Sequence, residues 1–175
     1  MNENPAGMNV VIIGSGAASV SAANAIRKNS SDSKISIYTR ENIYPYYRPA
    51  ITKSIAEKAG VTESMLRPDK FYHDNRIDVH TGNEAKSIDL NFKKIIFADN
   101  TSVHYDKLLI ATGAKCFIPP FPGADLPQVI ALREKSDLDR LLVTLGDNPK
   151  KVAVIGGGLL GLETAWGLSL LNHEV

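Results

Sequence analysis

The sequence contains little cysteine, no long apolar run and no excess of charge of either sign. Cys116 is the single cysteine among 175 residues, so the chain can form neither an internal disulfide nor a cysteine-based zinc site. No apolar stretch approaches the roughly 20 residues that cross a bilayer, and residues 1–8 lack the basic start of a signal peptide. From these absences we expect a cytoplasmic globular protein that is neither secreted nor membrane-bound.

The charge balance argues against further classes of partner. The chain has 20 basic and 19 acidic side chains, and a net charge of +1 creates no electrostatic field that would attract nucleic acid. The four histidines show no spacing typical of metal ligands, so we expect no metal site.

The first regular pattern begins at residue 10. Residues 10–13 form a short β-branched run, typical of a strand buried on both faces. A Gly-Ser-Gly turn at 14–16 ends this run, residues 17–28 have the apolar spacing of a helix, and residues 35–38 are again rich in β-branched residues. This order predicts a parallel sheet with a right-handed crossover.

The turn at 14–16 has the spacing of a dinucleotide-binding loop. Gly14 permits a tight turn, and Gly16 lets the backbone approach a pyrophosphate that the start of the helix attracts. Ser19 replaces the usual third Gly or Ala and is small enough for close packing. Glu41 follows the second predicted strand and is the candidate for binding a ribose hydroxyl. The alternative is a solvated carboxylate beside a turn that binds nothing.

The middle of the chain is less regular. We expect, in order, an irregular stretch over 40–67 with a helix near 52–58, a small antiparallel meander over 77–101 with a turn at 98–100, a strand over 107–111, a proline-rich linker at 119–123 and a helix over 136–145.

A second copy of strand, glycine loop and helix begins at residue 150. Residues 150–155 are an apolar run flanked by basic residues, with two lysines before Val152-Ala-Val-Ile155. Gly156, Gly158 and Gly161 then complete the full glycine pattern at the start of a helix. Two nucleotide sites on one chain suggest two cofactors with a hydride passing between them, whereas the alternative is a duplication that has kept no ligand.

With both loops in place, the chain resembles the N-terminal part of the pyridine nucleotide–disulfide oxidoreductase superfamily. Within it, the rubredoxin and ferredoxin reductases and the flavin region of NADH-dependent nitrite reductases are the most similar. The resemblance spans nearly the whole chain and rests, besides the loops, on Tyr47-Arg48-Pro49 with Lys53, Tyr105-Asp106-Lys107, Ala111-Thr112-Gly113 and Glu163.

The resemblance implies an α/β fold with two parts. The first is a Rossmann-like FAD-binding domain, with a parallel sheet and a small antiparallel meander, and the second is the start of another Rossmann-like nucleotide-binding domain. We therefore expect an FAD-binding domain over 1–123, a connecting helix and linker over 124–149, and the start of the NAD(P)H-binding domain over 150–175.

The resemblance also implies roles for individual residues. Lys53 would lie near the reactive edge of the flavin and pair with Glu163 as the catalytic residues, although from the residues alone a surface lysine is the alternative. NAD(P)H would contact Gly156, Gly158, Leu159 and Gly161. The expected FAD contacts are Gly14, Ser15, Gly16, Ala17, Ala18, Glu41, Arg48, Pro49, Lys53, Ala85, Ala111, Thr112 and Gly113.

One departure from the superfamily narrows the expected reaction. Residues 42–53 contain no cysteine and Cys116 has no second thiol, so we interpret Cys116 as structural or incidental and disfavour thiol-dependent reduction. Electrons would instead pass from NAD(P)H through FAD to a redox protein or domain, such as a rubredoxin, a ferredoxin or a nitrite-reductase domain. The sequence leaves open whether the protein forms a homo-oligomer.

The alternative function is a non-catalytic FAD-binding fragment or subunit that needs another polypeptide to complete its site. The sequence stops where the next strand of the second unit is expected, so we expect an incomplete portion with little NADH turnover by itself.

Overall fold

A computed structural model describes residues 7–58 and 64–175. The chain divides into two compact units, each built from two stretches of sequence. The first unit comprises Met1–Tyr46 and Met65–Gly113, and the second comprises Tyr47–Ser64 and Ala114–Val175.

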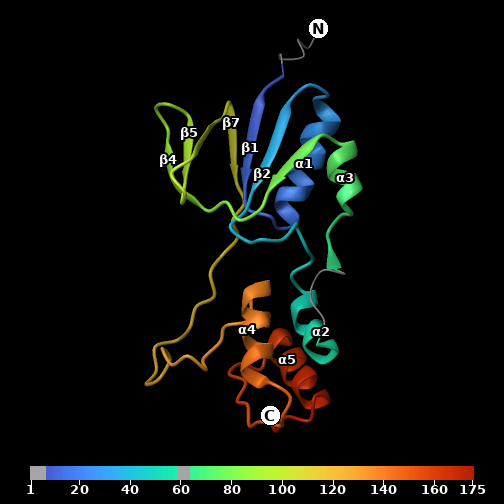
Figure 1. The fold of residues 1–175 in the computed structure, drawn as a ribbon, viewed down its shortest axis with the longest axis vertical. Coiled ribbons are helices and arrows are strands. Elements are labelled where there is room, and N and C mark those ends of the chain that lie inside the picture. Colours follow the sequence, from blue (N-terminus) through green and yellow to red (C-terminus); the bar gives the residue numbers. More distant parts are fainter. Residues whose placement is uncertain (1–6, 59–63) are drawn as a thin grey trace. The chain divides into compact units, whose positions relative to one another are not determined.

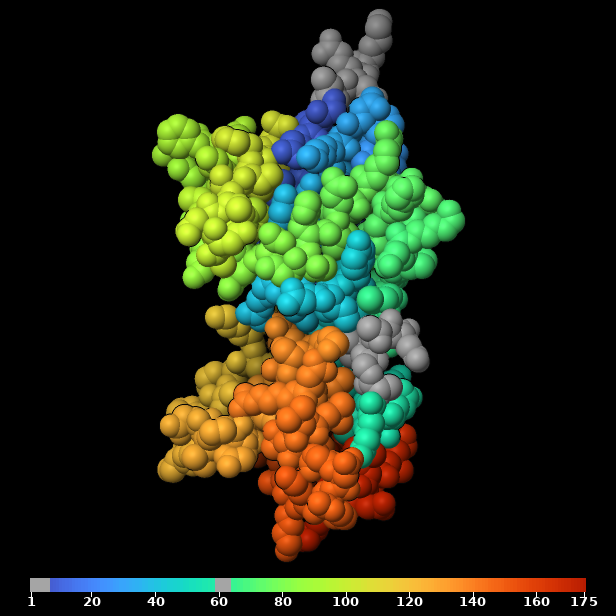
Figure 2. Space-filling view, viewed as in Figure 1, coloured from blue at the N-terminus to red at the C-terminus, as the bar shows by residue number. Residues whose placement is uncertain are grey.

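The first unit is built on a four-stranded parallel sheet. Strand β1 (Asn9–Ile13) is joined to β2 (Lys34–Tyr38) by helix α1 (Ala17–Asn29), as the sequence predicts. Strand β7 (Lys107–Ile110) pairs with β1 in parallel, so residues from opposite ends of this unit lie side by side, yellow beside blue in Figure 2. With β3 (Ile77–His80), the strand order is β3-β2-β1-β7.

Different layers cover the two faces of this sheet (Figure 1). Side chains alternate along β1, so Ile12 faces α1 and α3 (Asp69–Asp74), while Val11 and Ile13 face the other side. That other side is covered by a three-stranded antiparallel sheet of order β4-β5-β6, made of β4 (Ala85–Asp89), β5 (Lys94–Phe97) and β6 (Ser102–His104). The expected α/β class, parallel sheet and small meander are confirmed.

The prediction that residues 77–80 belong to the meander is wrong. Strand β3 pairs in parallel with β2, with Ile77 opposite Ile35 and His80 opposite Tyr38. Ile77 is buried while Asp78 is exposed, and this alternation occurs equally in a strand at the edge of a parallel sheet and in a meander strand. The short helix α3, which follows Pro68, has no counterpart among the predicted elements.

The second unit contains the helices α2 (Ala50–Glu57), α4 (Lys135–Leu145) and α5 (Leu159–Leu170). Helices α2 and α5 approach closely at Gly167, where a Cβ atom would lie 3.3 Å from Ile55 Cβ. Residues 119–123 form neither helix nor strand, as predicted. In the part of the chain that the structure describes, no helix has both the length and the apolar character needed to cross a membrane.

The predicted strand over 150–155 is not a regular strand. Its pairing is limited to a parallel bridge between Lys151 and Glu174, in which Val152 N–H donates to Glu174 C=O over 2.7 Å. An apolar run becomes a strand only beside a partner long enough to form a ladder, and here Glu174 alone pairs with it among the described residues.

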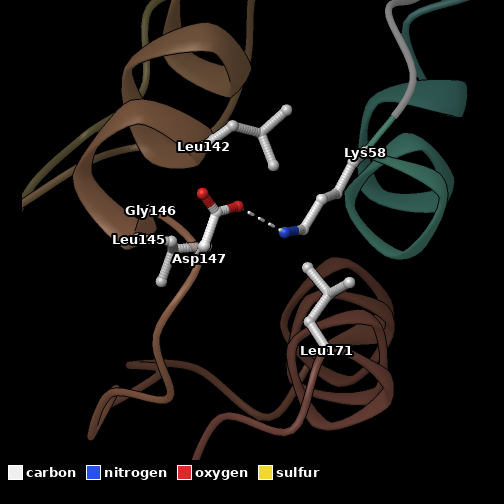
Figure 3. Close-up of a pocket in the computed structure, with 6 residues that line it drawn as sticks. All are labelled: Lys58, Leu142, Leu145, Gly146, Asp147 and Leu171. Carbon is white, nitrogen blue, oxygen red and sulfur yellow. Dashed lines mark hydrogen bonds and ion pairs between the residues drawn. The ribbon is translucent and has the colours of Figure 1, made fainter.

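A small pocket in the second unit lies where the ends of its helices meet (Figure 3). The Lys58 ammonium and the Asp147 carboxylate point toward each other across it, 3.3 Å apart and well exposed, so this ion pair adds little stability. None of the residues predicted to bind a cofactor lines this pocket. The lining residues are Lys58, Leu142, Leu145, Gly146, Asp147 and Leu171.

Candidate functional site

Three predicted segments meet at the carboxyl edge of the parallel sheet in the first unit. The glycine loop follows β1, the segment of Glu41 follows β2, and Ala111 follows β7. Gly14 N–H donates to Tyr38 C=O over 2.8 Å, and Ala111 N–H donates to Ile13 C=O over 2.7 Å. Because the strands are parallel, all three segments emerge at the edge where open α/β sheets bind ligands.

The two glycines of the first loop have different reasons to be glycine. Gly14 has a φ of +111°, and a Cβ atom there would lie 2.2 Å from the Ala111 carbonyl oxygen. Gly16 has an ordinary φ of −84°, and a Cβ atom there would meet no described residue within 4 Å. The fold therefore requires Gly14, whereas Gly16 leaves open space beside the backbone.

The open space at Gly16 adjoins the start of a helix. Gly16 is the N-cap of α1, no side chain in residues 7–58 and 64–175 caps the helix, and Ala17 and Ala18 are exposed. The first N–H groups of such a helix have no partner within the helix and favour an anion. Together with the absent Cβ, they form a cradle that fits a pyrophosphate.

Two serines, Ser15 in the loop and Ser19 in the first turn of α1, are buried. Ser19 is fully buried, and its hydroxyl finds no hydrogen-bond partner within the described residues. The buried Ser15 hydroxyl donates to Thr39 Oγ1 over 2.9 Å. Ser19 thus packs α1 closely against the sheet, as expected of the third position, and Ser15 joins the loop to the end of β2.

Glu41 is held in place at the end of β2. The Tyr46 hydroxyl donates to Glu41 Oε2 over 2.7 Å, and Glu41 N–H donates to Thr39 Oγ1 over 3.3 Å. Neither Thr39 nor Tyr46 is among the site residues that the sequence predicted. Thr39 follows the second strand directly and Tyr46 belongs to a tyrosine-rich stretch, and these positions are the only signals that could have found them.

The remaining FAD candidates of the first unit lie in two places. Thr112 and Gly113 follow Ala111 at the same sheet edge, and Gly113 has a φ of +72°. Ala85 begins β4 opposite Phe97 and packs against the second face of the sheet.

The second glycine loop repeats the geometry of the first. Gly156 has a φ of +123°, and a Cβ atom at Gly161 would lie 2.0 Å from the Gly156 carbonyl oxygen. Gly158 is the N-cap of α5, and in the described part of the chain no side chain caps this helix and no atom would lie within 4 Å of a Cβ atom at Gly158. Leu159 is the first residue of α5 and is exposed. Like Gly16, Gly158 has an ordinary negative φ, so neither its backbone nor its surroundings among the described residues require a glycine.

The predicted pair of Lys53 with Glu163 does not form. Thr52 Oγ1 donates to Glu163 Oε2 over 2.6 Å, and no ion pair joins Lys53 to Glu163 in residues 7–58 and 64–175. One residue further along α2 turns the side chain by about 100°, so Thr52 faces α5 while Lys53 is exposed to solvent.

The last candidates of the second unit precede α2. Pro49 is the N-cap of α2 and is exposed. Arg48 donates from Nη1 to Arg133 C=O over 3.4 Å. Cys116 is exposed, and its predicted structural or incidental role stays a prediction.

A family model described as pyridine nucleotide-disulphide oxidoreductase matches residues 8–175. This match covers both glycine loops and confirms the resemblance inferred from them.

Curated relatives and a solved structure agree with this match. A rhodocoxin reductase of Rhodococcus erythropolis is 35% identical over 159 residues, with 90% of this chain and 37% of the relative covered. An NADH oxidase of Methanocaldococcus jannaschii is 38% identical over 175 residues, with 96% and 39% covered. The crystal structure of an NADH:rubredoxin oxidoreductase of Clostridium acetobutylicum matches with a TM-score of 0.82 at 28% identity, covering 96% and 43%. The chain therefore spans 37% to 43% of the length of these proteins.

Proposed function

The chain belongs to the pyridine nucleotide-disulphide oxidoreductase family, and on that premise we propose that it is part of an FAD-dependent oxidoreductase that takes electrons from NADH or NADPH. The observation that carries the proposal is the repetition of one loop geometry. Both loops combine an uncapped helix start with a middle glycine whose missing Cβ leaves open space. Two such loops suit two dinucleotides.

The first loop is proposed to hold FAD. Gly16 and the first N–H groups of α1 would bind the pyrophosphate, with Ala17 and Ala18 beside them, and Glu41 would accept a hydrogen bond from the adenosine ribose. FAD supplies a ring that accepts a hydride and releases single electrons. The proposed FAD-binding domain spans residues 1–123.

The second loop is proposed to hold the pyrophosphate of NADH or NADPH. Gly158 and the start of α5 offer the same cradle as the first loop, with Leu159 exposed beside it. Residues 150–175 would then begin the nucleotide-binding domain, after a connection over 124–149.

Lys53 is proposed as a cation that stabilises negative charge on the reduced flavin. Its exposed ammonium and the hydrogen bond from Thr52 to Glu163 support a revised pairing, in which Thr52 orients Glu163 and Lys53 acts separately. If Lys53→Met reduces flavin with NADH as fast as the wild type, Lys53 has no such role.

The acceptor is proposed to be a redox protein or domain, such as a rubredoxin, a ferredoxin or a nitrite-reductase domain. The names of the rhodocoxin and rubredoxin reductases among the similar proteins support this class. The alternative is an FAD-binding subunit that needs a second polypeptide to complete its site.

An absorbance scan of the purified chain, followed by anaerobic titration with NADH, separates these two functions. A flavin band that NADH bleaches supports the oxidoreductase. A band that NADH leaves unchanged supports the FAD-binding subunit. No band after reconstitution with FAD contradicts both.

A further inference from the structure

We propose that Thr39 and Tyr46 are positioning residues that hold Glu41 in place for a ribose hydroxyl, an inference that rests on the function proposed above. Neither side chain belongs to the glycine pattern, and both contact Glu41. The site is thereby organised before any nucleotide arrives.

The backbone around Glu41 is fixed by the neighbouring turn after β3. A Cβ atom at Gly82, which has a φ of +71°, would lie 2.4 Å from Asn42 Oδ1, so the two segments are in close contact. Three hydrogen bonds join them, from Thr39 N–H to His80 C=O over 3.0 Å, from Asn83 N–H to Thr39 C=O over 2.7 Å and from Gly82 N–H to Glu41 C=O over 3.0 Å.

The Thr39 hydroxyl connects this segment to the glycine loop. It accepts hydrogen bonds from the Ser15 hydroxyl and from Glu41 N–H. Thr39 and Ser15 are both only 4% exposed, and hydrogen bonds are electrostatically stronger in such surroundings than in water. The loop proposed for the pyrophosphate and the residue proposed for the ribose are therefore held at a fixed spacing.

The Tyr46 hydroxyl fixes the Glu41 side chain itself. Tyr46 is 2% exposed and donates to Glu41 Oε2 over 2.7 Å, a bond strengthened by the negative charge of the carboxylate. A glutamate otherwise has much rotamer freedom, which a ligand would have to restrict on binding. Because Tyr46 already restricts the Glu41 side chain, a ribose hydroxyl that binds it loses less affinity to side-chain ordering.

The test measures how strongly the chain prefers a nucleotide with a ribose 2′-hydroxyl over one without it. Isothermal titration calorimetry gives the Kd values of the chain for ADP, which contains the adenosine and both phosphates of FAD, and for 2′-deoxy-ADP. We expect the wild type to favour ADP about tenfold, since a hydrogen bond to a charged group has about that effect. Glu41→Ala should abolish this preference and Tyr46→Phe should reduce it to about threefold.

Tyr72→Phe is the matched control for Tyr46→Phe. Tyr72 is also 2% exposed and lies in the same unit, but its hydroxyl has no hydrogen-bond partner within the described residues. Its removal should leave the tenfold preference unchanged. Thr39→Val should reduce the preference for ADP, whereas Thr39→Ser, which keeps the hydroxyl, should retain it.

The outcomes separate the inference from the function on which it rests. If the wild type and Glu41→Ala show the same preference, Glu41 does not bind the ribose and the positioning role falls with it. If Glu41→Ala loses the preference while Tyr46→Phe and Thr39→Val keep it, only the positioning role is wrong. If Tyr72→Phe loses as much as Tyr46→Phe, the effect is general packing and the inference is also wrong.

Discussion

At Gly14 a Cβ atom would lie 2.2 Å from the Ala111 carbonyl oxygen, whereas at Gly16 it would have no neighbour within 4 Å among the residues that the structure describes. We therefore expect Gly14→Ala to lower the free energy of unfolding by about 3 kcal/mol, through backbone strain and displacement of β7. Gly16→Ala, two residues away, should change it by less than about 1 kcal/mol. Urea unfolding followed by circular dichroism measures both, and equal losses would show that the loop geometry is not as described.

Because of Tyr72, we expect the free energy of unfolding to depend on pH in the alkaline range. Burial is the largest cause that raises its pKa to about 12 from an ordinary 10.0, Arg67 opposes this shift, and Asp69 and Tyr44 add to it. The folded state disfavours the phenolate, so the contribution of Tyr72 to the free energy of unfolding depends on pH. This contribution is complete below pH 10 and is lost as the pH rises toward 12.

Tyr72→Phe should accordingly raise the pH at which half of the protein is unfolded, since phenylalanine has no proton to lose. The exposed Tyr47→Phe serves as the control and should not raise this midpoint. A Tyr72→Phe midpoint at or below that of the wild type would contradict the account.

Among the helices, α2 and α5 can cross closely because Gly167 has no side chain. Gly167 lies 3.3 Å from Ile55 Cβ, measured from the position that its own Cβ would take. Gly167→Leu should force the helices apart and cost about 2 kcal/mol, and Ile55→Ala in the same chain should recover part of that loss. Ser169→Leu, at an exposed position of α5, is the control. Strict additivity of the Gly167 and Ile55 effects in urea unfolding would show that the two residues are not in contact.

The sequence predicted elements well where their pattern was local. The helix after Gly16 and the strands around it were found because apolar periodicity and glycine positions suffice. Strand β3 was assigned to the wrong sheet because alternation does not show which strand pairs with it. Residues 150–155 were predicted as a strand from their composition, but a strand also needs a partner, and Lys151 alone has one among the described residues.

At the scale of the whole molecule, the repeated loop geometry carries the functional account. The sequence identified both loops and Glu41 because glycine spacing and an acid after the second strand are visible along the chain. It could not identify Thr39 and Tyr46, whose contacts with Glu41 depend on side-chain directions in the folded unit. The family resemblance implied a pair of Lys53 with Glu163, whereas in the structure the Thr52 hydroxyl donates a hydrogen bond to that carboxylate.

The assignment of FAD to the first glycine loop is tested by the Kd of FAD for the wild type, Gly16→Val and Gly158→Val. Both glycines have an ordinary negative φ and open space at the Cβ position, so either valine should leave the fold intact. The account predicts that Gly16→Val weakens FAD binding about tenfold or more, while Gly158→Val leaves the Kd of FAD unchanged. An unchanged Kd in Gly16→Val, or an equal loss in both variants, would contradict the assignment of FAD to the first loop.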